Sequence, residues 1–327
     1  MQNKSCEMKF GRLSIVFFLV ILINFSCKKD DGGGDITPIE IRDRTEQQIE
    51  DKAALMTYLN NHYYNYGELE SNENPSLEDI DISPLDGDIP NPDQNKLLSD
   101  PDYGVETKIV DFADTEYEIY FLRLNQGGGA DSPNFPDKVR VRYEGFLLDN
   151  SIFDSAVTPV DFDLVGDGVN TFGLIPGWRK VLPTFNTAES FVDGTDGTVD
   201  YMNHGLFIPS GLAYFSSGTT GISAYTPIIF KFELLQTEVN DHDGDGVPSY
   251  LEDIDGDGEL LDNTDNDFTS DRFGNTFPIY DYIDTDDDND GVLTINEDID
   301  GDGDPTNDIG ANGIPKYLDA TETESKI

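Results

Sequence analysis

The 327-residue sequence contains only two cysteines, Cys6 and Cys27, and both lie within the first thirty residues. No disulfide can therefore cross-link the rest of the chain, whose stability must come from a hydrophobic core or from bound ions. Basic residues are scarce as well: 20 Lys and Arg stand against 66 Asp and Glu, for a formal net charge of −46. A charge of this size repels polyanions, so it excludes nucleic acid as the main partner.

The N-terminus has the pattern of a lipoprotein signal peptide. Basic residues occur within residues 1–12, an apolar run follows over residues 13–25, and Ser26 then precedes Cys27. The apolar run is too short to span a bilayer comfortably, which is typical of a cleaved signal. We expect cleavage before Cys27, whose thiol would then carry diacylglycerol. An ordinary N-terminal membrane anchor is the alternative.

The residues after Cys27 continue as Lys-Lys-Asp-Asp-Gly-Gly-Gly. This basic and then acidic tract resembles the export signal of surface lipoproteins in gliding bacteria, and the glycines favour a flexible tether. We therefore predict a signal peptide over residues 1–26 and a tether over residues 27–42. The expected location is the cell envelope of a Gram-negative bacterium, as an outer-membrane lipoprotein exposed at the surface.

Residues 43–104 are predicted to form a helix followed by a connector. Residues 43–66 carry apolar side chains at helical spacing, and Gly67 would end the helix. These apolar residues are Ile49, Ala53, Met56, Leu59 and Tyr63. Residues 70–104 are rich in Pro, Asp and Asn, which is typical of a connector. We expect the helix to pack on the following domain; capping it or pairing with a second copy are the alternatives.

Residues 105–238 predict one β-rich domain. Strand-like runs separated by Gly, Pro and polar turns occur at residues 116–124, 138–148, 205–215 and 227–236. Val139, Val141 and Tyr143 alternate, which would turn one face of the sheet inward. A short helix is expected at residues 176–182. The predicted fold class is α+β: an antiparallel half-barrel sheet with one short helix, an N-terminal helix and an extended C-terminal tail.

Five landmarks follow one another in this region: VRVRYEGFLLDNSIFDS, PVDFDLV, GLIPGWRKV, IPSGLAYFSS and PIIFKFELL. Their content and order are similar to those of the FKBP-type peptidyl-prolyl cis-trans isomerase family, over residues 105–238. The whole chain also resembles FKBP-type lipoproteins associated with gliding motility. The resemblance implies an FKBP fold and an isomerase that acts on proline-containing polypeptides without a catalytic cofactor. In the cell envelope, such an isomerase would aid the folding of exported or surface proteins.

Ten positions of this sequence match pocket residues of the family, and the resemblance therefore implies that they form the active site. Trp178, the only tryptophan, would form the pocket floor, and Tyr214 would bond the bound peptide. The ten residues are Tyr143, Phe153, Asp154, Phe162, Leu174, Ile175, Trp178, Tyr214, Ile222 and Phe230.

The residue types suit this chemistry. Rotation about an X-Pro bond breaks no covalent bond but must overcome a barrier of roughly 18–20 kcal/mol that amide resonance creates. The twisted transition state has lost this resonance, so an apolar and water-poor pocket favours it over the planar ground state. No nucleophile, metal or acid–base pair is needed. The sequence accordingly has only three histidines and contains no GxSxG, HExxH or P-loop motif.

Some positions depart from the family pattern around the predicted pocket. Asn150 and Phe215 stand where glycine is usual, and Ser223 and Ala224 replace two prolines. Asn tolerates the positive φ that such a turn needs. The altered loops keep open an alternative function, a non-catalytic module that grips proline-containing segments on a calcium-stiffened surface stalk. A third hypothesis makes the tail an adhesive or assembly module, with the β-rich domain as its scaffold.

The tail over residues 241–327 holds 27 Asp and Glu against three basic residues. Residues 241–252, the first loop, match residues 286–297, the second loop, 45 positions later. Both loops place Asp at positions 1, 3 and 5, Gly at position 6 and Glu at position 12. This spacing is that of a loop that wraps one Ca²⁺ ion with carboxylates and one backbone carbonyl at position 7.

A second Asp-x-Asp-x-Asp-Gly run follows each loop and lacks the Glu, so it predicts a weaker site. The pattern over residues 241–320 resembles thrombospondin type 3-like repeats, in which ions replace a hydrophobic core. A disordered acidic tail is the alternative. The predicted Ca²⁺ ligands are Asp241, Asp243, Asp245, Val247, Glu252, Asp253, Asp255, Asp257, Asp286, Asp288, Asp290, Val292, Glu297, Asp298, Asp300 and Asp302.

Overall fold

The computed structural model describes residues 41–72, 75–85, 95–96, 104–168, 173–190, 204–261, 263–264, 268–270 and 274–327. The predicted signal peptide, Cys27 and nearly all of the predicted tether lie outside the described residues. Within the described ranges, no helix combines the length and the apolar character needed to cross a bilayer.

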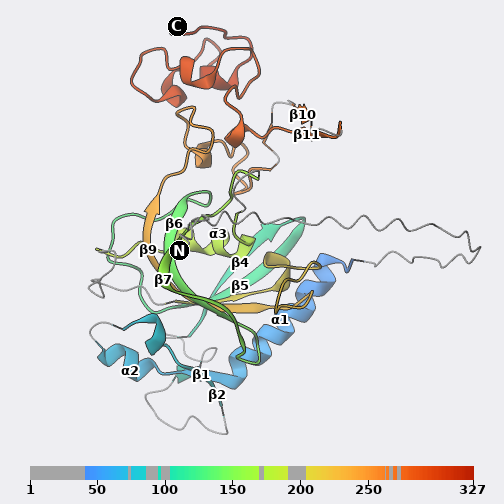
Figure 1. The fold of residues 1–327 in the computed structure, drawn as a ribbon, viewed down its shortest axis with the longest axis vertical. Coiled ribbons are helices and arrows are strands. Elements are labelled where there is room, and N and C mark those ends of the chain that lie inside the picture. The colour runs from blue at the N-terminus through green and yellow to red at the C-terminus, as the bar shows by residue number, and fades with distance from the viewer. Residues whose placement is uncertain are drawn as a thin grey trace, which may run out of the picture. The chain divides into compact units, whose positions relative to one another are not determined.

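The centre of the chain folds into a six-stranded sheet (Figure 1). Its strands are β4 (Glu106–Phe112), β5 (Thr115–Arg123), β6 (Lys138–Phe146), β7 (Ile152–Asp163), β8 (His204–Ile208) and β9 (Ile228–Glu238). Their order in space is β4-β5-β8-β9-β6-β7, and every neighbouring pair is antiparallel. The predicted α+β class with an antiparallel sheet is confirmed.

Four of the six strands correspond to predicted ones, whereas β4 and β7 were missed. Strand β7 lies at the edge of the sheet, and its residues are all exposed or half-buried, so it lacks a clear hydrophobic alternation. The predicted strand at residues 205–215 was wrong in its second half. Strand β8 ends at Ile208, and Pro209 then leads into the 3₁₀ helix η3 (Ser210–Leu212), because proline cannot donate to the strand ladder.

Hydrophobic residues are buried on both faces of the sheet, because successive side chains of a strand point to opposite sides. On β8, Leu206 belongs to the cluster that contains the short helix α3 (Pro176–Val181), whereas Phe207 belongs to the cluster that contains helix α1 (Arg44–Asn61). The sheet therefore lies between α3 and α1. The short helix predicted near residues 176–182 is confirmed, and so is the packing of the N-terminal helix on its own domain.

Helix α1 ends earlier than predicted. Its last residue is Asn61, and Gly67 lies inside the next helix, α2 (Tyr66–Ser71). The residues between the two helices belong to a small sheet made of β1 (His62–Tyr64), β2 (Ile82–Pro84) and β3 (Asn95–Lys96). Aromatic residues favour extended backbone, and β2 and β3 give this segment hydrogen-bonding partners. The prediction of a continuous helix to residue 66 was therefore wrong.

The buried face of α1 also differs from the predicted one. Ile49 is 67% exposed, whereas Leu55 and Leu59 are fully buried against the sheet. The same face buries Gln47 and Asp51, which hydrogen-bond each other at 2.8 Å. Of the predicted apolar stripe, Leu59 is buried and Met56 packs on the same cluster, whereas Ile49 and Ala53 are exposed, because the N-terminal part of the packed face is polar.

Two non-glycine residues adopt the left-handed backbone that the family pattern assigns to glycine. Asn150, in the β6–β7 turn, has φ 65°, and Phe215, after η3, has φ 40°. The prediction that Asn150 takes a positive φ is confirmed. Its side-chain oxygen also accepts a hydrogen bond from the Tyr58 hydroxyl at 2.7 Å, which ties the turn to α1.

The tail contains short 3₁₀ helices, one hairpin and many turns. Its elements are η4 (Ser249–Leu251), β10 (Phe268–Ser270), β11 (Thr276–Pro278), η5 (Asp281–Ile283), η6 (Thr294–Asn296), η7 (Pro305–Asn307) and η8 (Lys316–Leu318). The two remaining 3₁₀ helices, η1 (Leu77–Asp79) and η2 (Leu182–Thr184), lie earlier in the chain. The buried hydrophobic residues of the tail are few among those described: Val247, Leu260, Tyr282 and Tyr317.

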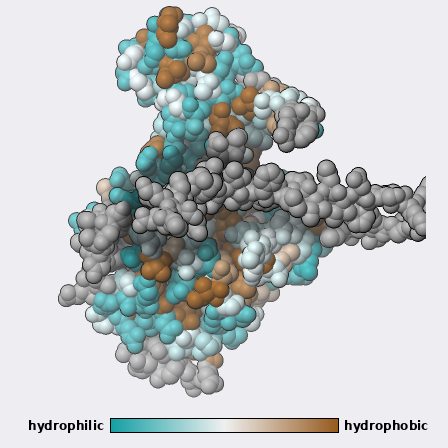
Figure 2. All heavy atoms as spheres, viewed as in Figure 1, coloured by the Kyte–Doolittle hydropathy of each residue, from teal (hydrophilic) through white to brown (hydrophobic). Residues whose placement is uncertain are grey.

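The surface of the tail mixes hydrophilic residues with small hydrophobic patches (Figure 2). Ile295, Ile309 and Ile314 are each more than 40% exposed. A segment that buries so little apolar area gains little from the hydrophobic effect and needs another source of stability. The predicted domain boundaries themselves stay predictions.

Candidate active site and candidate metal centres

Nine of the ten predicted active-site residues line one cavity of about 220 Å³. Strand β6 supplies Tyr143 and β9 supplies Phe230, while the remaining residues come from β7, from α3 with the two residues before it, and from the loop after η3. The lining residues are Tyr143, Phe153, Asp154, Phe162, Leu174, Ile175, Trp178, Tyr214 and Phe230. The tenth, Ile222, is buried in the core cluster beside them and does not line the cavity.

Aromatic rings in near-perpendicular contact form the floor and walls of this cavity. The ring centres of Trp178 and Phe230 lie 5.0 Å apart, and those of Phe153 and Phe230 lie 5.5 Å apart. Tyr143 meets Trp178 edge to face at 6.2 Å. Edge-to-face packing is favourable for aromatic pairs and fixes their orientation. Trp178 is only 3% exposed, yet it faces the cavity rather than a filled core.

Gly145 on β6 makes room for this aromatic wall. A Cβ atom at this position would lie 2.5 Å from the Phe153 ring and 2.7 Å from the Phe230 ring. Any larger residue would therefore push one of the two rings into the cavity. The sequence analysis did not single out Gly145, although it stands within the first landmark.

The polar groups of the cavity are two phenols and one carboxylate. The Tyr143 hydroxyl donates a hydrogen bond to Asp154 Oδ2 at 2.7 Å. Burial, and then this carboxylate, raises the pKa of Tyr143 above its usual value. Burial also raises the pKa of Tyr214, with a further contribution from Asp154. Both phenols therefore remain protonated at neutral pH; the Tyr143 proton is engaged by Asp154, whereas the Tyr214 hydroxyl can donate a hydrogen bond to a peptide carbonyl.

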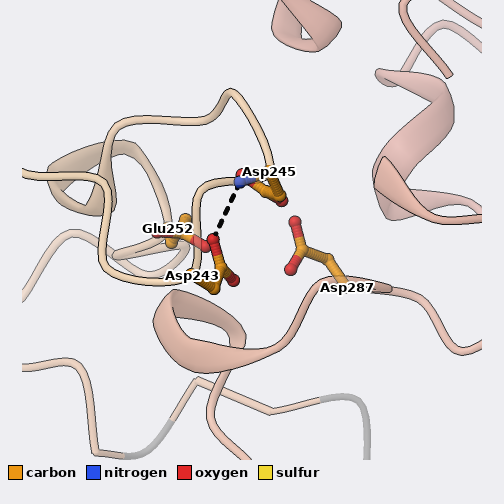
Figure 3. A group of neighbouring side chains, drawn as sticks. All are labelled: Asp243, Asp245, Glu252 and Asp287. Atoms are coloured by element: carbon orange, nitrogen blue, oxygen red, sulfur yellow. Dashed lines mark hydrogen bonds between the residues drawn. The ribbon is translucent and has the colours of Figure 1, made fainter. Parts of the chain in front are cut away.

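The first candidate metal centre combines carboxylates from both calcium-type loops (Figure 3). Ligand oxygens of Asp243, Asp245, Glu252 and Asp287 all lie within 4.8 Å of one another. The first three were predicted, whereas Asp287 was missed. Asp241, also predicted, is not in this group, and its carboxylate accepts hydrogen bonds from the Gly244 and Gly246 N–H groups.

Several carboxylate oxygens of this group are buried and have no hydrogen-bond partner among the described residues. They are Asp243 Oδ2, Asp245 Oδ2, both oxygens of Glu252 and both oxygens of Asp287. Burial, with the charges of the neighbouring carboxylates, raises the pKa of Glu252 to about 10 and that of Asp287 to about 11. Buried carboxylates are normally paired or bound to a metal, so this donor set fits a hard cation such as Ca²⁺.

The second loop forms a group of its own, with ligand oxygens of Asp286, Asp288 and Asp290 within 4.8 Å of one another. Glu297, predicted at position 12, is 1% exposed, and neither of its oxygens has a hydrogen-bond partner among the described residues. Burial, followed by the charges of Asp288 and Asp290, raises its pKa to about 8. Glu297 thus stands close to this group, as the loop pattern predicts.

The two runs without a position-12 Glu also gather their carboxylates. Oxygens within 4.8 Å of one another are contributed by Asp253, Asp255 and Asp257 in one run and by Asp298, Asp300 and Asp302 in the other. Most of these residues are exposed, in contrast to the first loop. The carbonyls of Val247 and Val292 stay predicted ligands, whereas their N–H groups donate to Asp245 at 2.8 Å and Asp290 at 2.6 Å.

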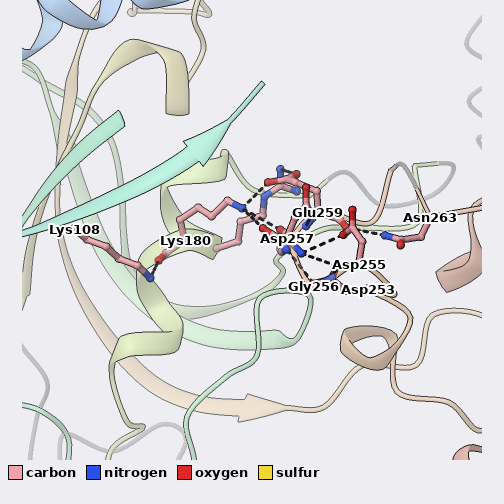
Figure 4. Close-up of polar contacts among 10 residues, drawn as sticks. Lys108, Lys180, Asp253, Asp255, Gly256, Asp257, Glu259 and Asn263 are labelled. Carbon is pink, nitrogen blue, oxygen red and sulfur yellow. Dashed lines mark hydrogen bonds and ion pairs between the residues drawn. The ribbon is translucent and has the colours of Figure 1, made fainter. Parts of the chain in front are cut away.

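The loop at residues 253–259 contacts the helix that carries the pocket floor (Figure 4). Glu259 forms ion pairs with Arg179 at 2.6 Å and with Lys180 at 2.8 Å. Lys180 also donates a hydrogen bond to the Gly258 carbonyl at 3.2 Å. Arg179 and Lys180 directly follow Trp178 on α3. This one helix therefore contacts the tail and also supplies the floor of the pocket.

No family model matches the chain. Over 126 residues it is 34% identical to the FKBP-type 22 kDa peptidyl-prolyl cis-trans isomerase of Escherichia coli (strain K12), a match covering 37% of this chain and 51% of that protein. Over 136 residues it is 31% identical to the FKBP-type peptidyl-prolyl cis-trans isomerase FkpA of Aeromonas hydrophila, covering 41% of this chain and 43% of that protein. The chain thus spans about half the length of these curated relatives.

Among solved structures, a peptidyl-prolyl cis-trans isomerase from Pseudomonas syringae pv. tomato is 29% identical and covers 40% of this chain and 80% of that chain, with a TM-score of 0.30. The sequence matches carry more weight than this superposition. Both curated relatives are named as peptidyl-prolyl cis-trans isomerases. The matching part of this chain is therefore similar in sequence to FKBP-type peptidyl-prolyl cis-trans isomerases.

Proposed function

We propose that this protein is a peptidyl-prolyl cis-trans isomerase that rotates X-Pro bonds in the cavity between β6, β7, β9 and α3. The observation that carries this proposal is the single cavity lined by nine of the ten residues expected from the sequence. Its aromatic lining would hold the proline ring away from water and so favour the twisted imide. The Tyr214 hydroxyl would orient the peptide by donating to one of its carbonyls.

The proposed clients are proline-containing segments of exported or surface proteins, and the proposed location is the outer membrane through a lipid on Cys27. Proline isomerisation is slow enough to limit folding in any compartment. An enzyme that needs no catalytic cofactor suits a compartment outside the cytoplasm. Metabolic labelling with a radioactive fatty acid should label the wild-type protein and leave a Cys27→Ala variant unlabelled.

Isomerase activity can be tested with a protease-coupled assay on a short proline-containing peptide, using the purified full chain. We expect Asp154→Ala to lower kcat/KM by about 10-fold or more, because a hydrogen bond to a charged group contributes about 1.5–3 kcal/mol. Asp161→Ala is a matched control on the same strand. Asp161 is largely exposed and pairs with Arg140 outside the cavity, so this change should leave kcat/KM within twofold.

The same assay separates the proposed enzyme from the non-catalytic alternative. A wild-type chain that binds the peptide but does not accelerate its isomerisation would support the binding module. A chain that does neither would contradict both proposals. Equal kcat/KM for Asp154→Ala and Asp161→Ala would remove the Tyr143–Asp154 pair from the mechanism.

The proposed role of the tail is to bind Ca²⁺, which would stabilise a segment that has few buried hydrophobic residues. Four acidic groups and several buried, unpartnered carboxylate oxygens support this role. Cations that bind only the folded tail would stabilise it by mass action. We expect EDTA to make residues 241–320 sensitive to protease while the sheet domain stays resistant. Equal resistance with EDTA and with Ca²⁺ would contradict a structural role for the ion.

A further inference from the structure

Asp287 belongs to the second loop in the sequence but lies among the carboxylates of the first loop in space (Figure 3). From this placement we infer that Asp287 is a ligand of the cation in the first loop. One ion then ties two repeats together, although the two loops begin 45 positions apart in the sequence. The inference rests on the proposed calcium role of the tail and adds to it a ligand that the loop pattern does not provide.

The surroundings of Asp287 support a role as a ligand. The residue is 4% exposed, and its two oxygens are buried without a hydrogen-bond partner among the described residues. Glu252, on the opposite side of the group, is 1% exposed and equally unpartnered. No Lys or Arg of the described residues forms an ion pair with either side chain. Two unpaired buried carboxylates this close together lose hydration and repel each other, and a cation between them would offset both costs.

Asp241, at position 1 of the first loop, is held by its own loop through both carboxylate oxygens. Oδ1 accepts a hydrogen bond from the Gly244 N–H at 2.7 Å, and Oδ2 accepts one from the Gly246 N–H at 3.2 Å. These bonds hold the tight turn in which Gly246 has φ 102°. Asp287, from the other loop, is the fourth member of the group whose ligand oxygens lie within 4.8 Å of one another, whereas Asp241 is not a member.

The same backbone contact orients the position-2 residue in both loops. The His242 N–H donates to the Ser249 hydroxyl at 3.1 Å, and the Asp287 N–H donates to the Thr294 hydroxyl at 3.3 Å. Each position-2 side chain then reaches the preceding part of the chain. His242 lies 3.3 Å from Asp163 at the end of β7, and Asp287 lies in the first metal group. The position-2 side chain thus connects each loop to the part of the chain that precedes it, which is strand β7 for His242 and the first loop for Asp287.

This geometry predicts opposite effects of Asp287→Asn with and without calcium. Without a cation, the substitution replaces one of four clustered acidic groups with a neutral amide of the same shape, so the variant should resist protease at least as well as the wild type. With Ca²⁺ present, it removes a ligand, so the affinity of one site should fall by about 10-fold or more. If Asp287 had only a structural role, its substitution would lower protease resistance both with and without Ca²⁺.

The test measures Ca²⁺ binding to the full chain by isothermal titration calorimetry, together with protease resistance of the segment between the loops in Ca²⁺ and in EDTA. Asp304→Asn is the matched control, because Asp304 is exposed and caps η7 outside all four metal groups. We expect Asp287→Asn to lose one class of sites and the calcium-dependent protection between the loops. Asp304→Asn should keep both.

Each outcome has a distinct meaning. If the wild type binds no Ca²⁺, the proposed role of the tail fails, and this inference fails with it. If the wild type binds Ca²⁺ and Asp287→Asn binds it equally, Asp287 is not a ligand and the calcium role stands. If Asp287→Asn is less resistant than the wild type in EDTA as well as in Ca²⁺, Asp287 supports the fold without contacting the ion, which also overturns the inference.

Discussion

Helix α1 is expected to hold the loop that carries the pocket residue Tyr214, and substitution of Asp51 tests this expectation. Asp51 is 2% exposed, and its Oδ2 atom accepts hydrogen bonds from the N–H of Ser210 at 2.8 Å and from its hydroxyl at 2.6 Å. The Arg44 guanidinium lies 4.2 Å from the centre of the Phe215 ring. These contacts flank Tyr214 on both sides along the chain.

The size of the effect follows from the two donors on Ser210, which Asp51→Ala would leave buried without an acceptor. A buried donor that loses its partner costs about 1–3 kcal/mol. Burial raises the pKa of Asp51, so removing this carboxylate also relieves some desolvation and offsets part of the loss. We therefore expect a net loss of about 2 kcal/mol in the free energy of unfolding, with loosening of the loop at residues 209–215.

Urea unfolding and isomerase kinetics of the full chain in Ca²⁺ would measure both effects. We expect Asp51→Ala to raise KM for the peptide several-fold, because the Tyr214 loop would sample more conformations. Asp51→Asn keeps an acceptor oxygen and should recover most of the affinity. Glu50→Ala, at the neighbouring exposed position, should change neither quantity. An Asp51→Ala variant that is destabilised but has unchanged KM and unchanged hydrogen exchange at residues 209–215 would refute the reasoning.

Two further predictions concern the sheet. Burial outweighs the ion pair with Arg142 and raises the pKa of Glu233 from 4.5 to about 7. The folded state therefore favours the protonated carboxyl of Glu233, and the stability that this preference contributes is lost as the pH rises from about 4.5 through 7. Between pH 5 and pH 8, urea unfolding of the wild type should therefore lose about 2–3 kcal/mol more than that of Glu233→Gln, and parallel pH profiles would contradict this. Gly145→Ala should lower kcat/KM at least 10-fold, since its Cβ would displace the Phe153 or Phe230 ring; full activity in the protease-coupled assay would show that the rings can move aside.

The sequence predicted the active site better than the elements that support it. The five landmarks fixed which side chains meet at the cavity, because each landmark combines a strand or turn with an aromatic residue at a set position. Edge strand β7 was missed because its residues are half-buried or exposed, so the hydrophobic alternation that identifies inner strands is absent. Helix α1 was found, but only the C-terminal part of its packed face was predicted, because Asp51 and Gln47 are buried by specific hydrogen bonds that no hydrophobic pattern reports.

The metal groups also show that a sequence pattern predicts only part of a site. Spacing along one loop identified Asp243, Asp245 and Glu252, since ligands that wrap one ion recur at short fixed intervals. It could not identify Asp287, which comes from another loop and occupies a position without a role in the pattern. The only available signal was the difference between the two copies at position 2, where one has His242 and the other has Asp287.

The strand order has a consequence for how the chain folds as it is made. Strand β9 pairs with β8 on one side and with β6 on the other, and it is the last strand of the sheet in the sequence. Until residues 228–238 have been synthesised, the sheet exists as two unconnected parts with open edges. Contacts between such distant segments form slowly, because a long loop must close first. The cavity, whose wall includes Phe230 of β9, can therefore form only after this last strand has joined the two parts of the sheet.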